Sequence, residues 1–272
     1  MKTFVTHIRP HLDDICGIWL YQKYVPSWKK AVLRFIPTSP TGGTPYGGKP
    51  VDSDPHIIHV GVCRGKYDEH KGNTHDSAAS LVWKDLRRRK LTPRDADAAE
   101  ALARLVHHVL EGDLGKRGGK PDRIYEIGRV IMGVPNSLER TRATFVMLDG
   151  LLNLLTDRVK LDRDWRKKKV FETRWGRGVG LTSKIKATDR AYEEGYVLVA
   201  QVDPIRHYRS IRAYGLSRVD LSRAYRRARA LEPQAEWYFH HSKRMLICGS
   251  DVASLRHPSK LTLGQLIALV KK

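Results

Sequence analysis

The sequence contains little cysteine, no long apolar segment and few acidic residues relative to basic ones. Its three cysteines, Cys16, Cys63 and Cys248, are too few and too scattered for a disulfide framework or a cysteine-rich zinc site. No run approaches the roughly 18 apolar residues that a membrane-spanning helix needs. The first residues also lack the apolar segment of a secretory signal. We therefore expect a cytoplasmic protein with reduced thiols.

The chain does contain enough apolar side chains for a core, together with a large excess of positive charge. Hydrophobic residues make up 41% of its 272 residues, which excludes a collagen-like or wholly disordered protein. The net charge is +21, and it is uneven: residues 1–113 carry 17 basic and 13 acidic residues, whereas residues 114–272 carry 33 and 16. Such a field attracts polyanions, so nucleic acid is the expected partner. An anionic membrane surface and an ordinary solvated basic surface are the alternatives.

Apolar strand-like and helix-like segments alternate along the first half of the chain. The expected strands are residues 2–7, 31–36 and 56–61, and the expected helices are residues 15–24, 77–89 and one beginning at Thr92-Pro93. Alternation of this kind predicts an α/β domain with a largely parallel sheet over residues 1–120. Glycine and proline predict a loop over residues 38–50 and a linker over residues 115–122.

The second half has a different pattern, which predicts a smaller α+β domain over residues 121–272. A capping box at Asn136–Glu139 predicts a helix to about Leu155, followed by a basic, irregular stretch over residues 158–190. The expected later elements are strands at 196–202, 207–214, 236–241 and 245–248 and helices at 221–230 and 262–271.

Potential metal ligands gather where the predicted strands and helices of the first half end. These residues are His7, His11, Asp13, Asp14, His59, Asp68, Glu69, His70 and Asp113. Open α/β sheets build their sites at the carboxyl ends of strands, so we expect these side chains to meet at one edge. Imidazoles mixed with carboxylates suit Mn²⁺, or else Mg²⁺ or Zn²⁺, and the supply is sufficient for one or two ions.

The order of the motifs carries further information. The motifs are Thr6-His7, His11-Leu12-Asp13-Asp14, His59-Val60-Gly61-Val62, Lys66-Tyr67-Asp68-Glu69-His70, Asp76 to Trp83, Asp113-Leu114-Gly115, Phe239-His240-His241 and Leu246-Ile247-Cys248-Gly249. In this order they resemble the DHH phosphoesterase superfamily, and most closely its melanocyte-proliferating-gene exonucleases. The resemblance covers nearly the whole chain and is strongest in the first half.

The resemblance implies a DHH-like metal-binding domain and assigns roles to individual residues. The implied metal ligands are His7, His11, Asp13, His59, Glu69 and Asp113, with Asp68 beside them. His70 would lie near the scissile phosphate, and we assign catalytic roles to His70 and Asp14. His59 stands where the family has a bridging aspartate, and Glu69 stands where it has a histidine. The ligand types are therefore exchanged while their number is kept.

In this superfamily the second domain closes over the substrate, and here it is strongly basic. The expected substrate-binding residues are Arg206, Arg209, Arg212, Lys243, Arg244, Gly249 and Ser250. The aromatic residues among the basic runs, Trp165, Trp175, Tyr208 and Tyr225, are either base-stacking platforms or parts of the core.

The resemblance and the charge together favour a metal-dependent phosphodiesterase. Its expected activity is that of a 3′–5′ exonuclease on short oligonucleotides or on single-stranded nucleic acid, RNA rather than DNA. A non-catalytic nucleic-acid-binding protein on the same fold and a small-molecule phosphohydrolase are the alternatives.

Overall fold

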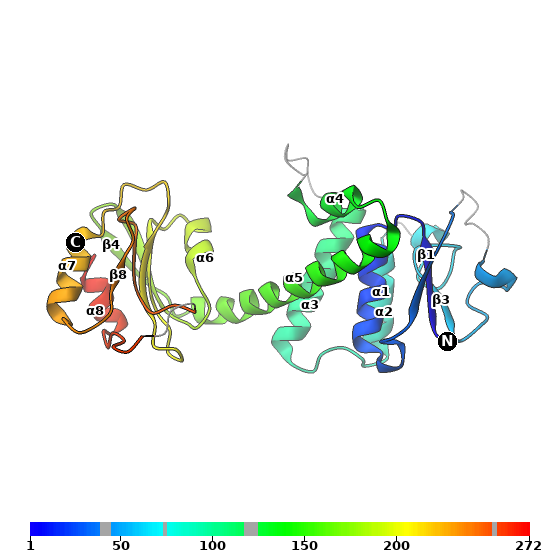
Figure 1. Cartoon of the computed structure of the whole chain (residues 1–272), viewed down its shortest axis with the longest axis horizontal. Helices are drawn as coiled ribbons and strands as arrows, with labels where there is room; N and C mark the ends of the chain where they lie inside the picture. Colours follow the sequence, from blue (N-terminus) through cyan, green and yellow to red (C-terminus); the bar gives the residue numbers. More distant parts are fainter. Residues whose placement is uncertain (39–44, 73–74, 117–124, 252–254) are drawn as a thin grey trace. The chain divides into compact units, whose positions relative to one another are not determined.

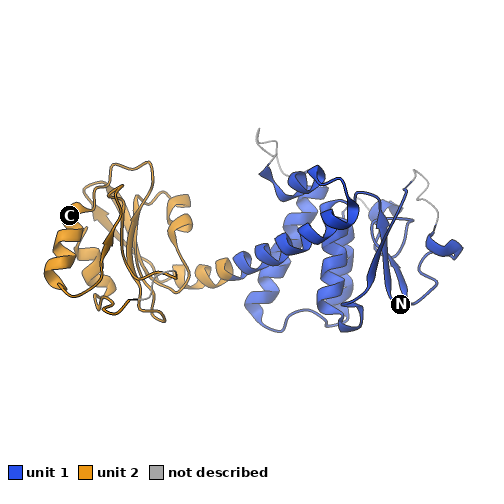
Figure 2. Ribbon diagram, viewed as in Figure 1, with its two compact units in different colours: residues 1–156 blue, residues 157–272 orange. Residues whose placement is uncertain are grey.

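The computed structural model describes residues 1–38, 45–72, 75–116, 125–251 and 255–272. The chain forms two compact units, residues 1–156 and 157–272, which are coloured separately in Figure 2. The boundary between the two units in the chain falls within the long helix α5 (Ser137–Trp165), whereas the sequence predicts a domain boundary near residue 120. That expected boundary lies outside the described residues, as do most of the expected linker at 115–122 and part of the expected loop at 38–50.

The first unit is built on a three-stranded parallel sheet. Strand β1 (Thr3–His7) lies between β2 (Val32–Ile36) and β3 (Ile57–His59). Both neighbours run parallel to β1, with Val5 opposite Arg34 on one side and His59 on the other. The predicted α/β architecture with a parallel sheet is confirmed for this unit.

Helices lie along one side of this sheet, as Figure 1 shows. They are α1 (Leu12–Tyr24), α2 (Ala78–Arg88) and α3 (Ala96–Asp113). Phe4 of β1 faces them and packs on the rings of Tyr21 and Trp28, with centroids 5.6 and 4.9 Å away. Val5 points to the other face, where it joins a smaller apolar cluster with Val62. This alternation along β1 accounts for the apolar run in the sequence, because the strand is covered on both faces.

The helix starts follow local capping signals, with one correction. Helix α3 begins after Asp95, whose side chain accepts a hydrogen bond from the Ala98 amide at 2.9 Å. The helix therefore does not begin at Thr92-Pro93. The remaining short helices of this unit are η1 (Pro26–Trp28), η2 (Tyr46–Gly48), η3 (Glu69–Lys71), α4 (Ile127–Val130) and η5 (Ile131–Gly133). None of the described helices is long and apolar enough to cross a membrane.

The long helix α5 begins where the capping box predicts but continues past Leu155. The Asn136 side chain accepts hydrogen bonds from the amides of Leu138 and Glu139 at 2.9 and 3.0 Å. The helix continues to Trp165 because Leu161 and Trp165 are buried in the core of the second unit. Packing therefore extends the helix beyond the point that the local pattern indicates.

The second unit contains a six-stranded mixed sheet in the order β4-β5-β6-β7-β9-β8. Its elements are β4 (Lys169–Thr173), β5 (Gly176–Thr182), α6 (Thr188–Glu193), β6 (Leu198–Val202), β7 (Arg209–Ala213), α7 (Ser222–Leu231), β8 (Tyr238–Phe239), β9 (Met245–Cys248) and α8 (Leu263–Ala268). Strands β5 and β6 are parallel and the other pairs are antiparallel. Helices α7 and α8 cover one face, and α6 with the end of α5 covers the other.

The expectation of an irregular stretch over residues 158–190 is wrong, and the glycines of β5 explain why. A Cβ atom at Gly178 would lie 2.8 Å from the Phe171 ring, and one at Gly180 would lie 2.6 Å from Ile267 Cδ1. Glycine is required there because neighbouring side chains pack directly on the strand backbone. Because glycine is typical of loops, the local sequence pattern does not predict a strand at this position.

Candidate metal centre

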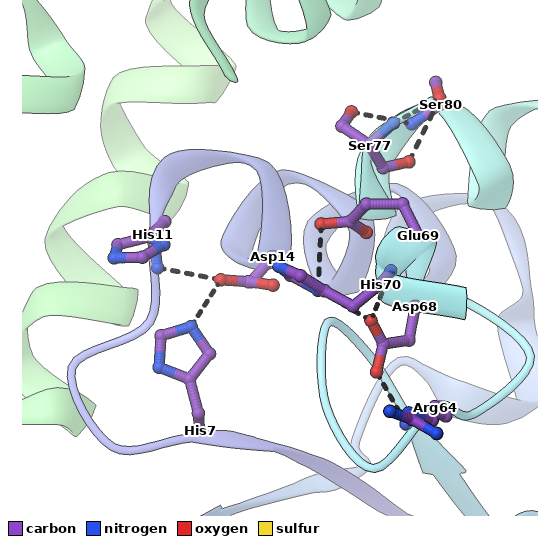
Figure 3. Close-up of polar contacts among 9 residues, drawn as sticks. All are labelled: His7, His11, Asp14, Arg64, Asp68, Glu69, His70, Ser77 and Ser80. Atoms are coloured by element: carbon purple, nitrogen blue, oxygen red, sulfur yellow. Dashed lines mark hydrogen bonds and ion pairs between the residues drawn. The ribbon is translucent and has the colours of Figure 1, made fainter. Parts of the chain in front are cut away.

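The loop between β1 and α1 places two histidines around a buried carboxylate. Asp14 Oδ2 lies 2.9 Å from Nε2 of the His7 ring and accepts a hydrogen bond from the His11 amide, also at 2.9 Å. Burial opposes protonation of His7, but its hydrogen bond to Asp14 and the charge of that carboxylate raise its pKa. These three residues each offer a ligand atom within 4.8 Å of the others. Figure 3 shows them converging at the start of α1.

Three carboxylates from distant parts of the first unit form a second, adjoining cluster. Asp13 of α1, Glu69 of η3 and Asp113 at the end of α3 each offer an oxygen within 4.8 Å of the others. Burial and the neighbouring carboxylates raise the pKa of Asp13 well above its usual range. Burial and then the charge of Asp14 raise the pKa of Glu69 to about 7. The raised pKa values show that this cluster is electrostatically unfavourable without a compensating cation.

Glu69 also has a buried oxygen that finds no partner in the described part of the chain. Its Oε2 atom is inaccessible to solvent and accepts no hydrogen bond there. A buried carboxylate oxygen in this condition costs free energy unless a proton or a metal ion satisfies it. The donor set of carboxylates with adjoining imidazoles suits Mn²⁺, Mg²⁺ or Zn²⁺. The residues therefore fit a divalent cation held by Asp13, Glu69 and Asp113.

Asp68 and His70 form an ion pair at the open side of the cluster. The His70 ring Nδ1 lies 2.8 Å from Asp68 Oδ1 and 3.5 Å from Glu69 Oε1. Asp68 also accepts hydrogen bonds from the amides of His70 and Arg64 at 3.0 and 2.6 Å. The bond to Asp68 raises the pKa of His70, whose side chain is 72% exposed. In Figure 3 the His70 ring lies beside Asp14, so an exposed proton donor adjoins the carboxylates.

The structure separates His59 from these clusters. Its ring Nδ1 lies 3.0 Å from Asp52 Oδ1, and its Nε2 accepts a hydrogen bond from the Tyr46 amide at 3.4 Å. His59 is opposite Val5 in the sheet register, so its side chain shares the face that Val5 occupies. Among the described residues, no group of three metal-binding side chains includes His59.

A buried arginine on α5 holds the loop that carries His11. The Arg140 side chain is buried and donates hydrogen bonds to the carbonyls of Arg9 and Pro10 at 3.1 and 3.4 Å. It also donates to the carbonyls of Val134 and Met132 at 2.9 and 3.0 Å. The sequence analysis missed Arg140, and no local signal identifies it because its partners on the loop lie about 130 positions away.

Most of the expected substrate-binding residues of the second unit make contacts within that unit. Arg206 binds Asp203, Asp251 and the Lys184 carbonyl. Arg209 donates to the carbonyls of Leu261 and His207, Arg212 donates to Met245 Sδ, and Arg244 donates to the Ser217 carbonyl.

The other three expected residues lie at turns of the second unit. Lys243 is exposed and lies 3.7 Å from Asp220. Gly249 has a φ of +88° and lies beneath the Tyr208 ring, where a Cβ would be 2.2 Å from Cδ1. Ser250 follows it and is half-buried. Gly249 is therefore required for packing, whatever its role in binding.

The aromatic residues of the second unit are divided between core and surface. Trp165 is buried and donates to Glu194 at 2.8 Å, and Tyr225 stacks on Phe239 with ring centroids 5.0 Å apart. Trp165 belongs to one core cluster of this unit, and Tyr225 and Trp175 are both partly buried against the other. Trp175 is half-buried with the Arg174 guanidinium 4.3 Å above its ring. Tyr208 has the Arg206 guanidinium 5.4 Å from its ring.

Comparisons with known proteins add no assignment to this geometry. No protein-family model matches the chain, and no curated protein matches it either.

Proposed function

We propose that this protein is a metal-dependent phosphodiesterase, acting as a 3′–5′ exonuclease on single-stranded RNA or short oligonucleotides. The observation that carries the proposal is the convergence of Asp13, Glu69 and Asp113 around a buried carboxylate oxygen that has no hydrogen-bond partner among the described residues. An acidic cluster of this kind, next to an exposed and protonatable His70, suits hydrolysis of a phosphodiester more than simple binding.

The residues divide the work of the reaction between them. A bound divalent cation would lower the pKa of a water molecule and neutralise phosphoryl oxygens. Asp13, Glu69 and Asp113 would hold that cation, with His7, His11 and Asp14 as the adjoining ligand set. His70 would bind a phosphoryl oxygen or protonate the leaving oxygen, and Asp68 orients its ring through the bond at Nδ1. The basic second unit would bind the sugar-phosphate backbone.

The proposal is tested by metal content and by hydrolysis of an end-labelled single-stranded RNA. The wild-type protein purified with Mn²⁺ should hold one or two ions per chain and release mononucleotides from the 3′ end. Asp13→Asn should abolish both properties. Asp157→Asn should preserve both, because Asp157 is exposed on α5 outside the cluster. His59→Gln should retain the metal, since the His59 ring binds Asp52 instead of the acidic cluster.

Two results would favour another activity. RNA binding without metal and without cleavage would contradict the proposal and favour a non-catalytic nucleic-acid-binding protein. Turnover of dinucleotides with no cleavage of longer strands would favour a small-molecule phosphohydrolase.

A further inference from the structure

A cavity of about 250 Å³ adjoins the acidic cluster in the first unit. It opens to solvent and is lined by the start of α1, the end of α3 and the short helices α4 and η5. Asp13 and Asp113 belong both to its wall and to the carboxylate cluster. A group bound in the cavity would therefore lie next to any cation held by those carboxylates.

The walls of this cavity combine apolar side chains with open space. Leu12, Val109 and Met132 contribute apolar surface, and Gly128 lies against Leu12, where a Cβ would be 3.6 Å from Leu12 Cδ2. The methionine thioether makes favourable contacts with aromatic rings. The volume is just below the roughly 300–1,000 Å³ of pockets that bury a drug-sized ligand, so it suits one nucleoside and not two.

An arginine brings a positive charge to the wall of this cavity. Arg129 of α4 is exposed, and its guanidinium makes no hydrogen bond or ion pair with any residue that the structure describes. Arginine binds phosphate through paired N–H donors. The carboxylates of Asp13 and Asp113 would repel a phosphate. The Arg129 guanidinium would offset this repulsion and bind the phosphate.

We propose that this cavity binds the terminal nucleotide of the substrate. The base and sugar lie against Leu12, Val109 and Met132, and Arg129 binds a phosphate beside Asp13 and Asp113. This inference rests on the proposed phosphodiesterase function and adds to it the place where the terminal nucleotide binds. A pocket for a single nucleoside explains stepwise release of mononucleotides, because only a terminal residue can enter it.

The test is calorimetric binding of 5′-AMP, the product of 3′–5′ hydrolysis, to the full-length protein with Mg²⁺ present. Inorganic phosphate serves as the comparison probe. The wild-type protein should bind 5′-AMP at least tenfold more tightly than phosphate. Arg129→Gln should weaken 5′-AMP binding at least tenfold, whereas Arg142→Gln, an exposed arginine of α5, should not change it.

A second variant tests the shape of the cavity. Gly128→Leu should fill the space beside Leu12 and abolish 5′-AMP binding while preserving metal content. Its control is Gly150→Leu, because a Cβ at this exposed position meets no atom within 4 Å. Equal affinity of the wild-type protein for 5′-AMP and phosphate would overturn the inference. Wild-type 5′-AMP affinity in both the Arg129 and Gly128 variants would overturn it as well.

These outcomes are separate from the outcome of the hydrolysis experiment. If the protein cleaves no RNA but its 5′-AMP binding is lost in the Gly128 and Arg129 variants, the proposed activity is contradicted and the pocket is supported. A protein that cleaves RNA but binds 5′-AMP independently of both residues would retain its activity and exclude this pocket.

Discussion

Gly61 is the residue that allows a carboxylate to approach the backbone at the centre of the site. It has a φ of +61°, and a Cβ built on it would lie 1.5 Å from Asp14 Oδ1. The position therefore requires glycine both for its backbone conformation and for the space that Asp14 occupies. Its neighbours Cys63 and Arg64 also have positive φ values, of 60° and 53°. The chain after β3 is thus constrained at several residues around the carboxylates of the candidate site.

We expect Gly61→Ala to displace Asp14 and to reduce metal affinity by more than tenfold. Gly48→Ala is a matched control because its φ is +69° and its Cβ would meet no atom within 4 Å. In the control the free energy of unfolding should fall by only about 1–2 kcal/mol, which is the cost of an alanine in the left-handed conformation. Its metal affinity should not change. Titration with Mn²⁺ and urea denaturation measure the two effects. Equal behaviour of the two variants would show that the contact with Asp14 has no consequence.

Glu69 makes the stability of the metal-free protein depend on pH. Its pKa rises from an ordinary value of 4.5 to about 7 in the folded chain. Between these values the native state retains a proton that the unfolded chain has lost, so stability falls as the pH rises through this window. The raised pKa of His7 acts in the same direction. The loss attributable to Glu69 should be at most about 3 kcal/mol between pH 5 and pH 8.

We expect Glu69→Gln to reduce this pH dependence without removing it, because the variant side chain has no proton to lose whereas the pKa values of His7, Asp13 and Asp113 are also raised. The measurement is the urea midpoint of the metal-free protein at several pH values between 5 and 8. Adding Mn²⁺ to the wild-type protein should reverse the trend, since the ion favours the ionised carboxylate. The same slope in the wild-type protein and the variant would exclude Glu69 as its source.

At the scale of elements, the site depends on how α5 holds the β1–α1 loop. The Arg9 amide donates to Ser137 Oγ at 2.9 Å, and Arg140 binds the carbonyls on the same loop. Arg9 has a positive φ of 55°, so the loop adopts a backbone conformation that needs external support. Asp149 adds to this attachment by accepting hydrogen bonds from Trp19 and Lys23 of α1.

We expect Arg140→Met to weaken Mn²⁺ binding by about 10–100-fold, the range found when residues that orient metal ligands are replaced. The variant removes the donor to four carbonyls, of which the contact with Pro10 is buried, so its stability should also fall, by roughly 2–4 kcal/mol. Arg140→Lys should restore part of the metal affinity through its remaining donors. Arg142→Gln is the control on the same helix. Unchanged Mn²⁺ affinity in Arg140→Met would show that the loop keeps its shape without this arginine.

At the scale of the whole molecule, the excess positive charge is concentrated in residues 157–272. These carry 26 basic and 12 acidic residues, a net charge of +14, whereas residues 1–156 have a net charge of +7 from 24 basic and 17 acidic residues. Many arginines of the second unit bind carbonyls and carboxylates inside it, so charge alone overstates the surface available to a polyanion. The exposed arginines of α7 make no side-chain hydrogen bond or ion pair with the residues that the structure describes; they are Arg223, Arg226 and Arg229.

We expect replacement of Arg223, Arg226 and Arg229 by glutamine to reduce the salt dependence of RNA binding. Each phosphate contact with a single strand contributes about 0.7 to the slope of log K against log salt, so the slope should fall by about 2. Arg227 is left in place because it donates to the Ala268 carbonyl at 2.9 Å. The control replaces Lys29, Lys30 and Arg87, exposed residues of the first unit. An equal fall in slope for this control would indicate general electrostatic attraction without a defined surface.

The sequence alone predicted much of the secondary structure and the residues that gather at the end of β1. Alternating apolar segments, Pro26 after α1 and the cap at Asn136 act over a few neighbouring residues, so they can be identified without a structure. The proximity of His7, His11 and Asp14 follows in the same way, because one strand, one loop and one helix start place them together.

Only the tertiary structure decided which distant side chains became partners. It brought Asp13 to Asp113, turned His59 toward Asp52, and placed Arg140 on the loop before α1. In the tertiary structure Arg206 binds Asp203 of its own unit. The segment that was expected to be irregular forms β5, whose glycines are needed for packing. Local patterns report the preference of a segment, whereas the partner of a buried charge depends on packing between segments that are far apart in the chain. For that reason the types of residue in the site were predictable and their arrangement was not.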